Sequence, residues 1–295
     1  TKLSANREFF ILLGLFISLG APLVFKMNSY ESIKLLTYIA FFSGLFGLIF
    51  LIVFVPDFNN SKKKNFKFLK ITKNLNKNDK FKKFIIILFI NSLANVLPML
   101  LFAFFVTDVL NGSDFDRQKI LFYYFLFALI GIPFWTKFGK FFTKSKTWSF
   151  SLVSAAVFFI FALFLDSGDI KMFIIISCLT GFCLAADMTI PPSIQADITD
   201  YHKMKFKEDI SGITFASITF LNKLSFAIGS IFVFGVLGLL DFETNTEISV
   251  NIKTFIFFSY AFLPVILKLI CSYMLKNFKS SQVDQLKIQK KIIEI

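Results

Sequence analysis

Two ionisable side chains, Asp187 and Lys223, lie deep inside long apolar runs of this sequence. A charge in an apolar environment is costly unless it is paired. Asp187 is the only carboxylate within any of these runs, so we expect it to pair with Lys223. Such a pair either fixes how two helices pack or responds to a cation or solute, and the sequence leaves both interpretations open.

Two asparagines form a second polar feature. Asn91 and Asn95 are spaced so that they lie on one face of a helix, and Pro98 after them removes a backbone hydrogen bond. Amides on one face suit a sugar-like or other polar ligand. They also suit hydrogen bonds between neighbouring helices, and these two interpretations are nearly balanced.

A pair of prolines, Pro191 and Pro192, follows Asp187 by about one helical turn. We expect them to break the helix near its cytoplasmic end and to expose backbone carbonyls beside the carboxylate. Irregular backbone in a membrane occurs where it lines a cavity. Asp187 together with this predicted break is therefore the most informative local feature.

The elements that must position these residues are membrane-spanning helices. The chain of 295 residues is 56% hydrophobic and contains 45 Phe, which excludes a soluble globular fold. Only helices of about 20 apolar residues can cross the bilayer at such lengths. We therefore predict an all-α polytopic membrane protein with eight spans: 9–25, 35–55, 84–106, 120–135, 148–165, 172–194, 213–240 and 255–275.

Basic residues are distributed unevenly among the loops. Lys and Arg total 32 against 19 Asp and Glu, giving a net charge of +13, and they gather on one set of alternate loops. The positive-inside rule places these loops and both termini in the cytoplasm. Anionic lipid headgroups, rather than nucleic acid, are the expected partner. We expect a multi-pass, monomeric protein of the plasma (inner) membrane.

The most basic loop also divides the chain. Residues 1–55 hold two spans, and residues 84–275 hold a bundle of six. We interpret 56–83 as a cytoplasmic loop between two bundles and 276–295 as a basic cytoplasmic tail.

Opposite charges follow the fourth and sixth spans. Lys137 and Lys140 belong to one predicted cytoplasmic loop, and Asp197 and Asp200 belong to the next. These charges either latch a closed state of the cytoplasmic side or face water as ordinary loop residues. Lys268, near the end of the last span, is expected to extend toward the cytoplasm, so we leave it out of the site.

Other residues that could do chemistry are few. His202, the only histidine, is predicted to lie in a loop rather than at depth, which makes it a poor proton relay. The three cysteines fall in apolar runs without metal-ligand spacing. We expect no metal, no cofactor and no enzyme activity, because no catalytic constellation is recognisable.

The region around Asp187 resembles a known family. The run from Ala185 to Tyr201 reads AADMTIPPSIQADITDY, and Asn222, Lys223 and Leu224 follow in the next span. This combination is similar to the glycoside-pentoside-hexuronide:cation symporters, the melibiose-permease-like group of the major facilitator superfamily. The likeness covers essentially the whole chain. The first two spans correspond to the family's helices five and six, so we expect the chain, which begins with Thr1, to lack four preceding helices.

The resemblance implies secondary active transport: cation-coupled symport of a sugar or similar polar solute by alternating access. It places Lys223 near the family's cation and sugar sites, Asn91 and Asn95 on the central cavity, and Lys140 and Asp200 in gating loops. Asp187 matches only a subset of the family. The coupling cation would be Na⁺ or H⁺, and its carboxylates would lie on the helices outside this chain.

Two alternatives stay open at this stage. Symporters of lysophospholipids or other lipid-like solutes share the same superfamily fold, so the solute could be a lipid. A non-transporting membrane scaffold is the other alternative, and it would show no solute-dependent change in stability.

Overall fold

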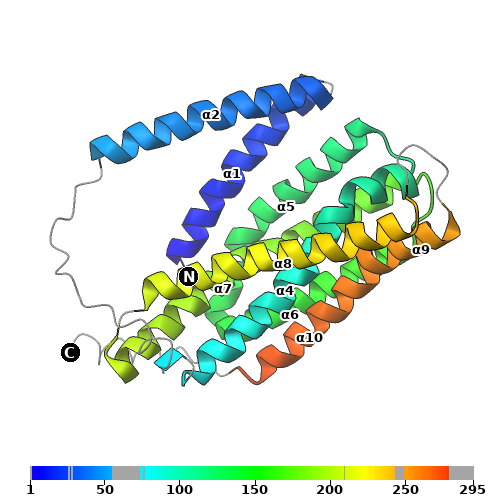
Figure 1. Ribbon diagram of the computed structural model, residues 1–295. Helices are drawn as coiled ribbons and strands as arrows, with labels where there is room; N and C mark the ends of the chain where they lie inside the picture. Colours follow the sequence, from blue (N-terminus) through cyan, green and yellow to red (C-terminus); the bar gives the residue numbers. More distant parts are fainter. Residues whose placement is uncertain are drawn as a thin grey trace.

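The computed structural model describes residues 2–25, 27, 29–54, 74–75, 77–208, 210–242 and 249–278, and these ranges contain helices without strands. Short π-helical turns η1 (Phe105–Val109) and η3 (Phe258–Phe262) and the 3-10 turn η2 (Phe161–Phe164) continue three of the long helices. The α-helices of these ranges, labelled as in Figure 1, are α1 (Lys2–Val24), α2 (Ser29–Phe54), α4 (Asp79–Phe104), α5 (Asp114–Phe141), α6 (Lys144–Ile160), α7 (Ile170–Phe206), α8 (Ser211–Leu239), α9 (Val250–Phe257) and α10 (Leu263–Lys276).

The described chain contains eight helical segments that are long and apolar enough to cross a membrane. This confirms the predicted all-α polytopic membrane protein. The fourth span is longer than predicted, because Ser113 and Asp116 form a reciprocal capping box that starts α5 at Asp114. Most of the predicted inter-bundle loop and tail, residues 55–73 and 279–295, lie outside the described residues.

The sixth span differs most from its prediction. α7 runs without interruption for 37 residues, with Pro191 and Pro192 inside it, so the predicted helix break is wrong. A proline removes one backbone hydrogen bond, and α7 is held on two sides by α5 and α6, which keeps the helix continuous. The two predicted cytoplasmic loops, one with Lys137 and Lys140 and the other with Asp197 and Asp200, are also helical. They belong to the last turns of α5 and of α7.

The helices from α4 to α10 form one bundle, as Figure 1 shows. α7 packs on α5 and α6, while α4 packs on α8 and α10. α1 lies against α5, where the rings of Phe16 and Phe122 are 4.6 Å apart. α2 stands away from the bundle in Figure 1, and its most apolar window is 0% buried.

An aromatic core fills the end of the bundle at which α5 and α7 begin. Phe105 in η1 and Tyr260 in η3 stack at a ring-centroid distance of 4.1 Å, with ring planes 9° apart. Phe173 of α7 packs against both rings. The two π-helical turns therefore meet through their aromatic side chains.

Close packing of α5 against α7 depends on two glycines. A Cβ atom at Gly131 would lie 2.6 Å from the carbonyl oxygen of Phe182, and one at Gly181 would collide with the backbone of Tyr124. Small residues at helix contacts let two backbones approach in a membrane. Glycine is thus required at both positions because the backbone of the neighbouring helix is too close for a Cβ atom, and not because of its own backbone conformation.

Replacing Gly181 with Leu should therefore separate α5 from α7. Overpacking of this kind costs about 1–3 kcal/mol or more, so the variant should unfold at a lower temperature than the wild type in detergent. Gly235→Leu in α8 is the matched control, because a Cβ there meets nothing within 4 Å. Equal melting temperatures of the Gly181 variant and the wild type would contradict this account of the packing.

Candidate functional site

Asp187 is the centre of a buried polar cluster to which four helices contribute. Its Oδ1 accepts hydrogen bonds from Asn91 Nδ2 at 3.1 Å and from Trp148 Nε1 at 2.5 Å. Its Oδ2 accepts from Asn95 Nδ2 at 3.0 Å and from Lys268 Nζ at 3.4 Å. Helices α4, α6, α7 and α10 thus meet at one carboxylate, and we call these five residues the Asp187 cluster.

Local sequence explains how each helix presents its group. Asn91 and Asn95 share one face of α4 because they are four residues apart, and this face meets α7. Trp148 lies in the second turn of α6, whose start is fixed by Thr143 accepting a hydrogen bond from the backbone of Lys146. Trp148 is 0% exposed, so its ring both fills the core and aims its N–H at the carboxylate.

The cluster is sealed from water and balanced in charge. Only 5% of the Asp187 side chain and 8% of the Lys268 side chain are exposed. Lys268 Nζ also donates to Asn95 Oδ1 at 2.7 Å. Breaking such a buried pair leaves an uncompensated charge. The structure therefore brings together the predicted site residues Asp187, Asn91 and Asn95. The carboxylate of Asp187 is held in position by its hydrogen-bond and ion-pair partners.

Every group that reaches Asp187 is a hydrogen-bond donor. Hard cations in proteins are held by several oxygen ligands, whereas the neighbours of this carboxylate present N–H groups and an ammonium. The geometry stabilises an ionised carboxylate. Across the described ranges, no group of three or more His, Cys, Asp or Glu side chains has metal-site spacing.

The partner of Asp187 corrects two sequence predictions. Lys268 pairs with Asp187, so the predicted pair with Lys223 is wrong, and Lys268 does not extend toward the cytoplasm. α10 packs on α4 and α6, and this packing brings the ammonium of Lys268 to the carboxylate of Asp187 on α7. A signal was present in the spacing, since Lys268, Cys271 and Leu275 fall on one helical face and all three are buried.

Lys223 lies elsewhere, near the middle of α8, and its side chain is exposed. It makes no ion pair with any residue that the structure describes. Beside it, Asn222 Oδ1 accepts a hydrogen bond from Ser92 Oγ of α4 at 2.7 Å. Ser92 and Asn222 join α4 to α8, and the exposed Lys223 follows Asn222 in the sequence; we call these three residues the polar strip.

Asp197, one of the residues predicted for a cytoplasmic gate, pairs with a lysine other than the two predicted ones. Lys144 Nζ, in the first turn of α6, donates to both carboxylate oxygens of Asp197 at 2.7 and 2.6 Å. It also donates to the carbonyl oxygen of Ser193 at 3.2 Å. Lys137 and Lys140 are exposed on α5, because the helix continues through the predicted loop. Asp200 lies about one turn beyond Asp197 on α7.

The histidine is also placed differently from its prediction. His202 belongs to α7 and is 0% exposed, so its predicted loop position is wrong. Its Nδ1 lies 3.4 Å from Asn78 Nδ2, and its Nε2 lies 3.8 Å from Glu208 Oε2. Asn74 Nδ2 also donates to Glu208 at 3.0 Å. These contacts tie the segment before α4 to the end of α7.

Comparison with known proteins identifies the sequence at the level of its family. A family model described as "MFS/sugar transport protein" matches residues 1–279. That range includes every helix of the structure, from α1 to α10. No curated protein matches the chain.

Removing one charge of the Asp187 cluster should destabilise the protein strongly. Lys268→Met leaves Asp187 buried without a counter-charge, so we expect a loss of about 3–5 kcal/mol in the free energy of unfolding. Asp187→Leu should have a loss of similar size. The double variant Asp187→Leu/Lys268→Met should be more stable than either single variant, as measured by denaturant unfolding in detergent.

A matched control is Lys83→Met on α4, which removes one exposed lysine and should change stability little. Additive losses in the double variant would contradict an energetic link between Asp187 and Lys268. Wild-type stability of both single variants would show that the pair is not sealed from water.

Proposed function

The chain belongs to the MFS/sugar transport protein family, and on this premise we propose that it couples the movement of a sugar or similar polar solute to a cation. It is a multi-pass membrane transporter of sugars or similar solutes of the major facilitator superfamily. Symport with Na⁺ or H⁺ by alternating access is our proposal for its mechanism. The family match over residues 1–279 is the observation that carries it.

The polar strip supports a solute pathway along α4 and α8. A charged side chain near the middle of a membrane helix does not rest against lipid, and it faces water or other protein. Lys223 is exposed at this depth, next to the Ser92–Asn222 hydrogen bond. Hydroxyl, amide and ammonium groups together can hydrogen-bond a sugar. We therefore assign the solute-facing role to these three residues.

The Asp187 cluster fixes the position of α4, the helix that carries Ser92 of the polar strip. Asn91 and Asn95 fasten α4 to the carboxylate of α7, and Ser92 lies between them in the sequence on the neighbouring face. In our proposal the cluster keeps Ser92 in place for the solute, so Asp187, Asn91 and Asn95 contribute without touching it. Because Lys268 already neutralises Asp187, the coupling cation needs other carboxylates, which we propose lie outside this chain.

The pair formed by Lys144 and Asp197 fits a cytoplasmic latch. Their side chains are 16% and 13% exposed, so the pair is largely withdrawn from water, where it is stronger than an exposed ion pair. A solute or cation can drive alternating access only by binding the inward and outward states unequally. We propose that this pair stabilises one of these states, with Lys137, Lys140 and Asp200 nearby.

The proposal also includes the orientation of the protein in the membrane and its location, which we infer from the distribution of basic residues among the loops. The basic loops and both termini face the cytoplasm by the positive-inside rule, and the protein resides as a monomer in the plasma membrane. The latch between α6 and α7 then lies on the cytoplasmic side, and the aromatic core of Phe105 and Tyr260 lies toward the opposite side.

Lys223→Gln should abolish cation-coupled uptake while leaving the protein folded and inserted. The reason is that the variant keeps a polar side chain but loses the charge that faces the pathway. Uptake of radiolabelled sugars, among them a galactoside, a pentose and a hexuronide, is measured in proteoliposomes under Na⁺ and H⁺ gradients. Lysophosphatidylcholine is assayed in parallel.

Lys34→Gln, which changes an exposed lysine of α2, is the control and should transport like the wild type. Unchanged coupled transport by the Lys223 variant would remove the role assigned to Lys223. Uptake of lysophosphatidylcholine without uptake of any sugar would replace the proposed solute class with a lipid.

Exchanging the charges of the latch tests its role separately. Lys144→Asp and Asp197→Lys should each reduce the rate of uptake by roughly fivefold or more, since each variant places like charges together and repels them by at least about 1 kcal/mol. The double exchange should recover much of the rate. Failure of the double variant to exceed the single variants, with all three inserted, would show that the pair does not act as a latch.

A further inference from the structure

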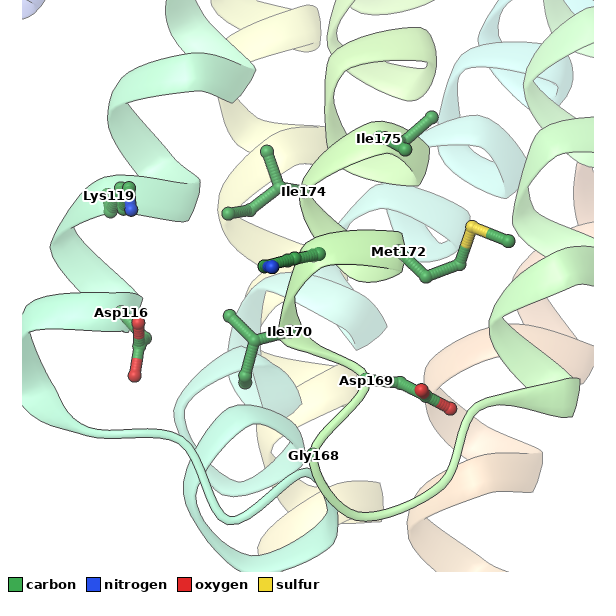
Figure 2. A pocket seen from close by; sticks show the side chains of 9 residues that line it. Asp116, Lys119, Gly168, Asp169, Ile170, Met172, Ile174 and Ile175 are labelled. Carbon is green, nitrogen blue, oxygen red and sulfur yellow. The ribbon is translucent and has the colours of Figure 1, made fainter.

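A second site lies at the other end of the bundle, where α5 and α7 begin. A cavity of about 650 Å³ opens there between the first turns of the two helices. In Figure 2, Asp116 and Lys119 of α5 lie across from Ile170 and Ile174 of α7, above the loop that contains Gly168. Residues of the Asp187 cluster and of the polar strip do not line this cavity.

Charges of both signs line the cavity, and one oxygen of each carboxylate accepts hydrogen bonds from the neighbouring loop. Asp116 Oδ2 accepts hydrogen bonds from Ser113 N at 3.0 Å and from Ser113 Oγ at 2.7 Å. Asp169 Oδ2 accepts from Asp166 N at 2.9 Å. These bonds direct both carboxylates at the loops that begin α5 and α7, where each stabilises local backbone.

The two lysines of the cavity, Lys119 and Lys171, are in a different situation. Neither forms an ion pair or a hydrogen bond with a residue in the described part of the chain, and neither ammonium is needed to hold a loop. Two ammonium groups that are free to donate can both hydrogen-bond the oxygens of one phosphate group. The cavity is therefore neutral in formal charge, and its two ammonium groups are donors without a hydrogen-bond partner in the described part of the chain.

The rest of the lining is apolar and continues into a membrane span. Ile170 and Ile174 form one wall, and Met172 and Ile175, each 54% exposed, lie on the outer side of α7. α7 belongs to a segment that is long and apolar enough to cross the membrane. A ligand that fits both parts has an anionic head and an acyl chain, since free phosphate would use only the lysines.

We propose that this cavity binds the headgroup of an anionic phospholipid. The phosphate lies between Lys119 and Lys171, and an acyl chain runs along Ile175 and Met172 on the outside of α7. The site is independent of the solute pathway, because it lies at the beginnings of α5 and α7 and shares no residue with the polar strip. Its occupant would steady the two helices whose close packing depends on Gly131 and Gly181.

The test measures lipid retained by the purified protein. The wild type, Lys119→Gln/Lys171→Gln and a control pair, Lys34→Gln/Lys83→Gln, are incubated with dioleoylphosphatidylglycerol or dioleoylphosphatidylcholine and examined by native mass spectrometry. The wild type should bind phosphatidylglycerol in preference to phosphatidylcholine. Loss of the two cavity lysines should weaken that binding on the order of tenfold, because each basic residue near anionic lipid adds to the affinity. The control pair should bind like the wild type.

Three results would overturn the proposal. Equal retention of phosphatidylglycerol by the cavity variant and the wild type would show that the lysines do not form the site. Equal affinity of the wild type for both lipids would remove the requirement for an anionic headgroup. Displacement of the lipid by inorganic phosphate alone, with direct phosphate binding, would identify a solution anion as the ligand. A thermal unfolding curve for each variant establishes that the comparison is made on folded protein.

Discussion

Burial of the Asp187–Lys268 pair is the constraint on which the six-helix bundle depends. Removing a carboxylate and an ammonium from water is expensive unless each finds partners of good geometry. Asp187 finds four donors on three other helices, and Lys268 finds two acceptors. A rotation of α4, α6 or α10 that removed one of these contacts would leave a buried polar group without its partner. The pair therefore fixes which faces of these helices meet.

The two ends of the bundle are held by different kinds of contact. Toward one end, Phe105 and Tyr260 stack, and Phe173 packs against both rings. Toward the other end, Lys144 and Asp197 join α6 to α7, and His202 contacts Asn78 before α4. Aromatic packing is rigid and independent of charge, whereas the ionic contacts respond to what lies beside them. An end that opens and closes would be expected where the ionic contacts are.

Polar groups in the membrane have two distinct roles in this protein. In the Asp187 cluster the carboxylate and the ammonium are buried and paired with each other, so its role is to position helices. The polar strip is exposed and its lysine is unpaired within the described residues, so it is suited to a ligand. Both roles occur on α4, through Asn91 and Asn95 on one face and Ser92 on the next. A transporter of polar solutes requires this separation, because a group that fastens the helices cannot also release a solute.

The sequence alone determined the eight spans and the all-α membrane fold, because long apolar runs and their basic flanks are local properties. It also identified Asn91 and Asn95 as a pair, since their spacing decides the helix face they share, and it singled out Asp187 as a buried carboxylate. The partner of Asp187, the continuity of α7 through Pro191 and Pro192, and the pairing of Asp197 with Lys144 were decided by tertiary structure. A charge in the membrane pairs with the partner that the packing brings nearest. The spacing of residues along one helix does not determine the distance between two helices.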